Sequence, residues 1–282
     1  MKVLKTSFSI ALMNIVKWIS DPRIWVVIVL LITFVNEYLK GIPSFVNSMG
    51  VKIGPWIFPF FFEWRYHKLM LMLPILLLFS DAPFIDRNQP YLMIRVDRLK
   101  WALGQIIYIV IASGIYFLFV LILSVVLIAP FVAYNSDWGS VIETLARTGA
   151  GLEFGMEIYF AERLVDYFYP QQAMFFSFIL SWLIGILLGL ILFVVNFVTK
   201  KPLLGMLIAG GFIALDAMIW ARGWASWLSP VSWNTLSTIS TDSLTFTPNI
   251  QQIFMMLFGL IGVLIAVAIY AVRHYEIQFI SD

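Results

Sequence analysis

Long apolar runs separated by short charged connections form the pattern of hydrophobic and polar positions along this chain. A bilayer core about 30 Å thick is crossed by roughly 20 helical residues, because each residue of a helix rises about 1.5 Å. The apolar runs predict six membrane-spanning helices, over residues 24–39, 64–80, 101–128, 173–198, 203–220 and 253–272. The second begins near Trp64, because the uninterrupted run over residues 69–80 is too short to cross alone. Its outer end then carries Arg65, His67 and Lys68.

The first twenty residues are amphipathic instead of continuously apolar. Apolar side chains at helical spacing share one stripe, formed by Leu4, Phe8, Ala11, Leu12, Ile15 and Ile19. The opposite side holds Lys2, Thr6, Ser9 and Lys17. We therefore expect residues 1–20 to form a helix that lies in the interface plane of the membrane. The apolar run behind it ends in Asn36 and Glu37 instead of a small-residue cleavage site, so we expect this segment to be retained.

Six spans place both termini on the same side of the membrane. The segments on that side hold most of the basic residues, which are Lys2, Lys5, Lys17, Arg23, Arg87, Arg95, Arg98, Lys100, Lys200, Lys201 and Arg273. Because basic connections stay in the cytoplasm, both termini are predicted to be cytoplasmic. The segment 130–170 is then extracellular. Its acidic residues alternate with apolar ones and predict an amphipathic helix that carries Glu153, Glu157, Glu162 and Asp166.

Composition supports an all-α polytopic membrane protein and excludes several chemistries. Hydrophobic residues make up 61% of the 282 residues, charged residues make up 12%, and the mean hydropathy is +0.93, whereas soluble domains are roughly 45 to 50% apolar. The lack of cysteine excludes disulfides and thiolate sites, and two histidines without clustered carboxylates predict no metal site. No repeat or linker divides the chain, so we treat residues 1–282 as one transmembrane domain with no cofactor of its own and no nucleic-acid partner.

The connection between the second and third predicted spans contains a short helix with two distinct faces, and Pro90 stands in its first turn. The apolar face is formed by Leu92, Val96 and Leu99, and the basic face by Tyr91, Arg95 and Arg98. Such a helix can dock on a soluble partner. Alternatively, its arginines bind lipid phosphates and only enforce topology.

Small residues recur at every fourth position of the span over 173–198. They are Ser177, Ser181, Gly185 and Gly189. Such a ridge lets another helix backbone approach closely, so we interpret it as a packing face within the chain or in a dimer rather than as a substrate path.

Asp216 lies inside the span over 203–220, where an ionised carboxylate costs at least about 2.5 kcal/mol. It therefore faces a partner, a cavity or the outer water. Two interpretations stay open: a position on a transport pathway, or a structural tie to Arg222 or a neighbouring helix.

Two aromatic stretches lie at the predicted outer side. Residues 56–62 are interrupted by Pro59 and predict an interfacial or re-entrant piece. Before the last span, four tryptophans crowd a Pro-interrupted stretch, and these are Trp220, Trp224, Trp227 and Trp233. They fit an interfacial aromatic belt or an outer re-entrant hairpin.

In order and spacing these elements resemble the permease subunits of ABC exporters of the type 2 family. The shared features are an interfacial basic helix, six spans, a basic helix in the first inner loop, and a Ser-Pro-x-Ser-Trp stretch, here residues 229–233, before the last span. The resemblance covers most of the chain. It implies that residues 90–98 form a coupling helix on a cytoplasmic ATPase subunit, with residues 1–20 beside it. It further implies that residues 223–240 cap the outer mouth and that two permeases, copies or paralogues, face each other.

The chain contains no Gly-x-x-x-x-Gly-Lys-Ser/Thr motif, so ATP and magnesium are expected on the partner subunit. We therefore expect a multi-pass permease of an ATP-driven exporter of a peptide, drug or lipid-like substrate in a bacterial plasma membrane, and not an enzyme. The outer segment 130–170 is longer than the usual connection of the family, which leaves the substrate open. An immunity or assembly protein, a secondary transporter, and an intramembrane enzyme built on Glu63 and His67 are the alternatives.

Overall fold

The computed structural model describes residues 2–84, 96–219, 223–239 and 246–274. This part of the chain is helical and contains no strand, apart from an isolated parallel bridge between Ile53 and Val132. The α-helices are α1 (Lys2–Val16), α2 (Pro22–Tyr38), α3 (Ile42–Met49), α4 (Arg65–Leu78), α6 (Arg98–Val126), α7 (Gly139–Arg147), α8 (Ala150–Glu153), α9 (Glu162–Tyr167), α10 (Pro170–Thr199), α11 (Pro202–Ile219) and α12 (Ile250–His274). The 3-10 turns are η1 (Lys17–Ser20), η2 (Phe58–Phe62), η3 (Ala129–Phe131), η4 (Gly223–Trp227), η5 (Pro230–Asn234) and η6 (Leu236–Thr238).

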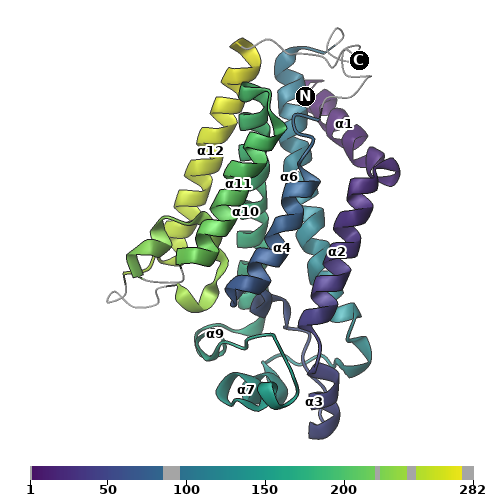
Figure 1. Ribbon diagram of the computed structural model, residues 1–282, viewed down its shortest axis with the longest axis vertical. Coiled ribbons are helices and arrows are strands. Elements are labelled where there is room, and N and C mark those ends of the chain that lie inside the picture. Colours follow the sequence, from purple (N-terminus) through teal and green to yellow (C-terminus); the bar gives the residue numbers. More distant parts are fainter. Residues whose placement is uncertain (1, 85–95, 220–222, 240–245, 275–282) are drawn as a thin grey trace.

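Four helical segments of the described chain are long and apolar enough to cross a membrane. They are Pro22–Met49, Arg98–Val126, Pro170–Thr199 and Ile250–His274. The fold is therefore an all-helical, membrane-embedded bundle (Figure 1). The two other predicted spans correspond to shorter helices. The apolar helix α11 has 18 residues, and α4 has 14 residues, which corresponds to a length of about 21 Å.

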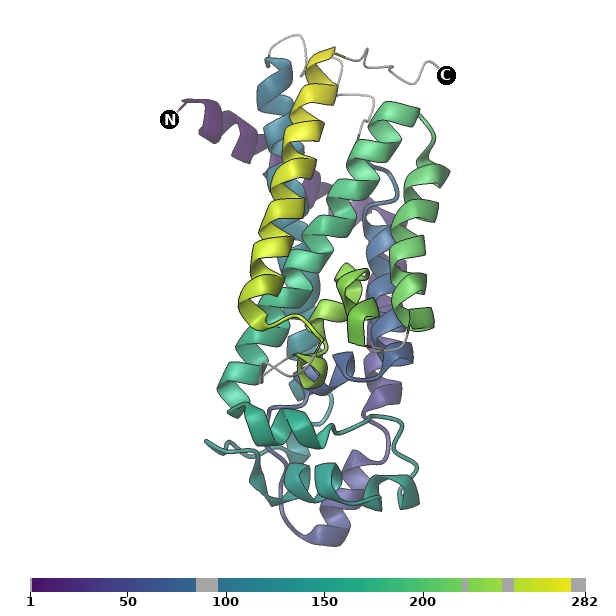
Figure 2. The same cartoon turned by 90° about the vertical axis from the view of Figure 1, so that its left-hand side faces the viewer.

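Helix α10 is the centre of the bundle, and it packs against α4, α6, α11 and α12 (Figures 1 and 2). Its ridge of small residues is buried throughout. A Cβ atom on Gly185 would stand 2.9 Å from Phe117, and one on Gly189 would stand 2.7 Å from Ile109. Both neighbours lie on α6, so the two glycines allow an approach that no larger residue would permit.

The N-terminal helix α1 crosses the beginning of α6 (Figure 1). Its buried face consists of Ser7, Ile10, Ala11 and Asn14, whereas Leu4, Phe8 and Leu12 of the predicted apolar stripe are exposed. A face of two polar and two apolar residues therefore holds α1 on the bundle. Ala11 of the predicted stripe is buried with this face, whereas Leu4, Phe8 and Leu12 remain exposed.

Residues 130–170 do not form the single amphipathic helix that the sequence predicts. The segment contains the short helices α7, α8 and α9, and residues 156–161 are not helical. Gly155 has a φ of +64°, which interrupts the helix. Aromatic side chains on either side turn inward, because Phe154 packs on Phe45 with ring centroids 5.2 Å apart and Phe160 packs on Phe60 at 4.8 Å. Burial of these rings outweighs the local helical pattern.

The connection between α11 and α12 folds back into the bundle. Turns η4, η5 and η6 of this connection lie toward the lower part of the bundle in Figure 2, and η5 contacts α10 and α11. Trp233 is 4% exposed and donates from Nε1 to the carbonyl oxygen of Ser226 at 2.8 Å, whereas Trp227 is 40% exposed. Trp233 is thus a core residue and not part of an interfacial belt. The side chains of Trp220 and Trp224 lie outside the described part of the structure.

Candidate functional site

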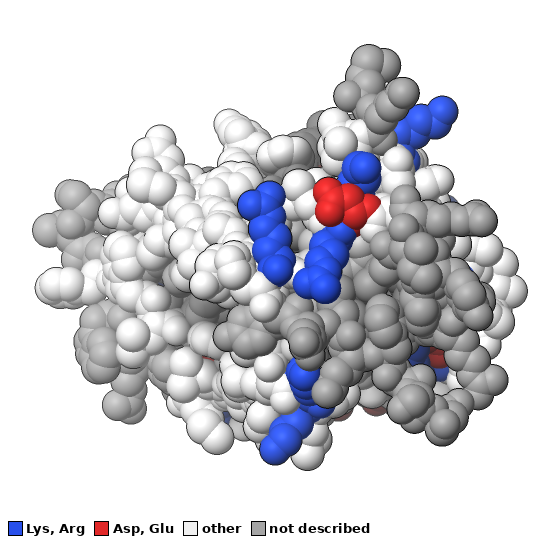
Figure 3. Space-filling model, turned by 90° about the horizontal axis from the view of Figure 1, so that it is seen from above, with Lys and Arg blue, Asp and Glu red and all other residues white. Residues whose placement is uncertain are grey.

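Charge is distributed unequally between the two ends of the bundle. The end where α6 begins and α10 and α12 end, which we call the terminal end, carries mostly basic residues, among them Lys5, Lys17, Arg23, Arg98, Lys100, Lys200, Lys201 and Arg273, beside the acidic Asp21, Asp81 and Asp97 (Figure 3). The opposite end carries the acidic residues Glu37, Asp137, Glu143, Glu153, Glu157, Glu162 and Asp166 together with the basic Lys40, Lys52, Arg147 and Arg163. Basic residues therefore prevail at the terminal end, whereas charges of both signs are mixed at the opposite end.

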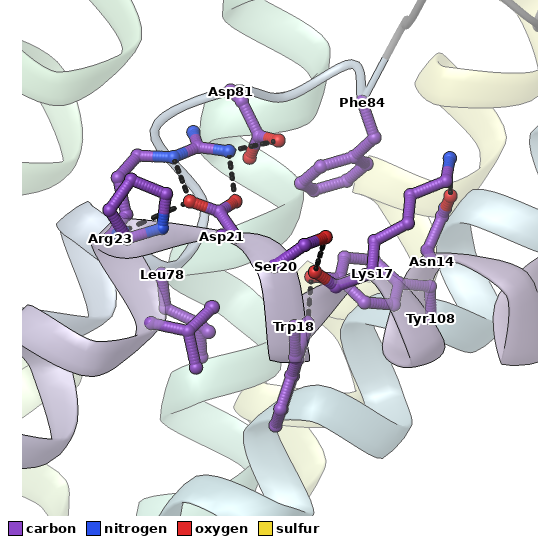
Figure 4. Close-up of a pocket in the computed structure, with 12 residues that line it drawn as sticks. Asn14, Lys17, Trp18, Ser20, Asp21, Arg23, Leu78, Asp81, Phe84 and Tyr108 are labelled. Carbon is purple, nitrogen blue, oxygen red and sulfur yellow. Dashed lines mark hydrogen bonds and ion pairs between the residues drawn. The ribbon is translucent and has the colours of Figure 1, made fainter.

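An ion cluster at the terminal end joins three elements (Figure 4). Asp21 caps α2 by accepting from the backbone N–H of Arg23 at 3.0 Å. The Arg23 guanidinium lies 2.6 Å from Asp21 and 2.8 Å from Asp81, which follows α4. The hydrogen bond from Arg23 holds the pKa of Asp21 below its usual value. The corner between α1 and α2 is therefore tied to the end of α4.

A cavity of about 520 Å³ opens beside this cluster (Figure 4). On its wall Trp18 donates from Nε1 to the Tyr108 hydroxyl at 3.0 Å, which joins η1 to α6. Asn14, also on the wall, donates to Gln105 Oε1 at 2.7 Å. The cavity is thus enclosed by elements that are hydrogen-bonded to one another.

Part of the predicted docking helix falls outside the described residues, namely Tyr91, Leu92 and Arg95. Val96 is half-buried in a bend, and Arg98 is the exposed first residue of α6, so Arg98 is not part of a short loop helix. The described segment before residues 85–95 is anchored on the bundle, and the segment after them continues into α6. Phe84 packs on Tyr108 of α6 with ring centroids 4.8 Å apart, and the carbonyl oxygen of Ala82 accepts from Asn196 of α10 at 3.0 Å.

Asp216 belongs to a second cluster, buried toward the opposite end. Its carboxylate lies 3.0 Å from Lys68 Nζ on α4, and these side chains are 7% and 4% exposed. Lys68 also donates to the hydroxyl of Thr235 at 2.7 Å, and Thr235 donates to the carbonyl oxygen of Phe62 at 3.1 Å. The tie to a neighbouring helix that the sequence left open is therefore with Lys68. Arg222 lies outside the described residues.

Glu63 and His67, on which the enzyme alternative is built, are both buried and do not reach the surface of the bundle. Glu63 precedes α4, and its Oε1 accepts from the backbone N–H of Leu236 at 3.1 Å and of Ser237 at 3.4 Å. The His67 ring packs on Tyr38, with centroids 4.1 Å apart. The two residues thus serve different contacts and do not form a pair.

The ridge of α10 also contributes to this region. Ser181 accepts a hydrogen bond from Asn234 Nδ2 of η5 at 3.2 Å, and Ser177 one turn away is fully buried. Within the described residues, no three His, Cys, Asp or Glu side chains come together as a metal site would require. The buried cluster is therefore suited to electrostatic contacts and hydrogen bonding.

Comparison with known proteins finds no relative of this chain. No family model, no curated protein and no solved structure matches it.

Proposed function

We propose that this protein is the membrane-spanning permease subunit of an ATP-driven ABC exporter of the type 2 family. It would form the pathway for a peptide, drug or lipid-like substrate and work with a separate cytoplasmic ATPase. The observation that carries the proposal is the anchoring of the described stems on either side of the loop that connects them over residues 85–95. One stem is joined to α6 and α10 through Phe84 and Ala82, and the other stem continues directly into α6.

Such anchoring supports a mechanical role for the loop. Helix α1 is joined to α6 at two levels, because Ser7 donates to the carbonyl oxygen of Lys100 at 2.8 Å and Asn14 donates to Gln105. Arg23 joins the α1–α2 corner to Asp81. A partner that pushes on the loop would therefore move α1, α4 and α6 together, as alternating access requires.

The charge distribution supports a cytoplasmic terminal end. Basic residues are more numerous there than at the opposite end, which is the asymmetry that the positive-inside rule describes. In the proposed topology α4 and α11 complete six crossings, α1 lies in the interface, and residues 130–170 face outward. The membrane would be a bacterial plasma membrane, with lipids around the exposed apolar faces.

Energy would come from the partner, which binds ATP and magnesium, because the chain has no P-loop sequence. A second permease, a copy or a paralogue, would complete the pathway. The chain itself would then catalyse no reaction.

The first test is co-purification with an ATPase encoded beside this chain, followed by ATP hydrolysis and transport in proteoliposomes. The double variant Arg95→Glu with Arg98→Glu should insert normally and uncouple hydrolysis from transport. Arg147→Glu, a charge reversal on an exposed residue at the opposite end, is the control and should leave coupling intact. Unchanged coupling in the double variant would reject the docking role. Transport by the purified chain without any ATPase, or protection of cells without transport, would favour the secondary transporter or the immunity protein instead.

A further inference from the structure

A small chamber lies between the beginning of α4 and turns η5 and η6, toward the end of the bundle opposite the terminal end. Its volume is about 210 Å³. The polar residues on its wall that matter here are Glu63, Arg65, Lys68, Asp216, Thr235 and Ser237. Two aromatic side chains, Trp64 and Tyr159, also line it.

Glu63 is the unsatisfied group of this chamber. Its Oε1 is fixed by the backbone N–H groups of Leu236 and Ser237, so the carboxylate is held in one orientation. The residue is only 9% exposed, and its Oε2 is buried without a hydrogen-bond partner among the residues that the structure describes. A buried carboxylate oxygen in this state is costly unless a donor reaches it.

The two cationic side chains that line the chamber, Lys68 and Arg65, donate to groups other than Glu63 Oε2. Lys68 donates to Asp216 and Thr235. The Arg65 guanidinium stands over the ring of Tyr66, 4.8 Å from its centroid, and donates to its hydroxyl at 3.2 Å. The Glu63 carboxylate beside the chamber thus keeps one oxygen that accepts no hydrogen bond within the described structure, and a cationic ligand in the chamber would supply the opposite charge.

Two aromatic side chains line the same chamber as Glu63. Trp64 and Tyr159 pack with ring centroids 6.0 Å apart, and Tyr159 is 51% exposed. Faces of such rings attract organic cations. A bare metal ion would need several more carboxylate or imidazole ligands than Glu63 supplies.

We propose that this chamber binds an organic ammonium group, with Glu63 as its counter-ion and Trp64 and Tyr159 as its aromatic wall. Burial raises the pKa of Glu63, which lies outside the spanning helices, to about 7. A bound cation would offset this burial cost and favour the ionised form. The ammonium belongs either to the transported substrate or to an ethanolamine headgroup of the outer leaflet. Its assignment to the substrate rests on the proposed function, whereas the binding itself does not.

The test measures thermal unfolding of the purified full chain in phosphatidylcholine nanodiscs, with n-butylammonium against n-butanol. We expect n-butylammonium to raise Tm by at least about 3 °C in the wild type and n-butanol to leave it unchanged. Glu63→Gln should abolish the shift, and Glu37→Gln, an exposed acid on the same side, should retain it. Tyr159→Ala alters an exposed ring that does not threaten folding and should weaken binding about two- to fivefold.

A second arm replaces part of the phosphatidylcholine by phosphatidylethanolamine without added amine. Stabilisation that Glu63→Gln removes identifies the headgroup as the ligand, and stabilisation only by n-butylammonium identifies a soluble amine. Equal shifts in the wild type and in Glu63→Gln, or no shift in either arm, would overturn the proposal. None of these measurements involves an ATPase, so failure here is distinct from failure of the exporter assignment.

Discussion

The pair formed by Lys68 and Asp216 allows a quantitative test of the buried cluster. Both side chains are less than a tenth exposed, and the Nζ to Oδ2 distance is 3.0 Å. Removal of one partner leaves an uncompensated charge in a low-dielectric site, which typically costs about 3–5 kcal/mol. Replacement of both by apolar residues of similar size removes the attraction together with the desolvation cost, so it is close to neutral.

We therefore expect Lys68→Met and Asp216→Leu each to lower the free energy of unfolding by about 3–5 kcal/mol, and the double variant to lower it by much less than either. The assay is reversible unfolding in mixed micelles, read by near-UV circular dichroism. Lys40→Met is the matched control, because Lys40 and Glu37 form an exposed ion pair whose loss should cost at most about 1 kcal/mol. Single variants as stable as the wild type, or a double variant as unstable as the sum of the two, would refute this account of the pair.

Three further predictions concern packing, polar contacts and pH. Gly189→Leu should destabilise the protein by about 1–3 kcal/mol or more in the same assay, whereas Gly262→Leu, at a position with open space around it in the described structure, should be nearly neutral. Asn14→Leu should cost about 1–3 kcal/mol because it leaves Gln105 buried without its donor, and Asn14→Leu combined with Gln105→Leu should recover most of that loss. The folded-state pKa of Glu63 is raised to about 7 from the ordinary 4.5, so its stabilising contribution is present below pH 4.5 and is lost as pH rises through 7. The Tm of the wild type relative to Glu63→Gln should fall from pH 4.5 to pH 8, and a constant difference would contradict this assignment.

Most helix positions could be predicted, because a membrane helix is recognised from a long run of apolar residues in the sequence. The predicted spans over 101–128 and 173–198 differ from α6 and α10 by no more than three residues at each end. Caps and aqueous contacts contribute little to such helices, so the length of the apolar run determines their limits.

The outer segment could not be predicted in the same way, because its local pattern competes with tertiary packing. Regular spacing of Glu153, Glu157 and Glu162 indicates a helix, but Phe154 and Phe160 have partners more than 90 residues away in the chain. The periodicity of a sequence reports only which residues share a face of one helix, and it does not report contacts with residues far away in the chain.

The candidate site was partly visible in the sequence. Asp216 stands out as a charge within an apolar run, but its partner Lys68 lies 148 residues away and resembles a residue of the membrane edge. The rule that charges inside a membrane pair with one another would have pointed to Lys68, the basic residue deepest in the predicted span over 64–80. Glu63 has no comparable signal, because the groups that donate to it are two backbone N–H groups of η6.

Helix α4 connects the two polar clusters, and this connection bears directly on how the proposed exporter would work. Lys68 stands in its first turn, Asp81 follows its last turn, and Pro74 lies between them. Because proline removes one backbone hydrogen bond of the helix, bending at Pro74 is less costly than bending elsewhere in α4. In the proposed topology a push on residues 85–95 would reach Asp81 at the end of α4, and α4 leads from there to the chamber. A second route runs through α10, because Asn196 donates to the carbonyl oxygen of Ala82 and Ser181 accepts from Asn234 of η5. Rigid transmission through α4 would strain the pair of Lys68 with Asp216, whereas bending at Pro74 would spare it, so the stiffness of α4 bears on whether the two ends of the bundle open together or in turn.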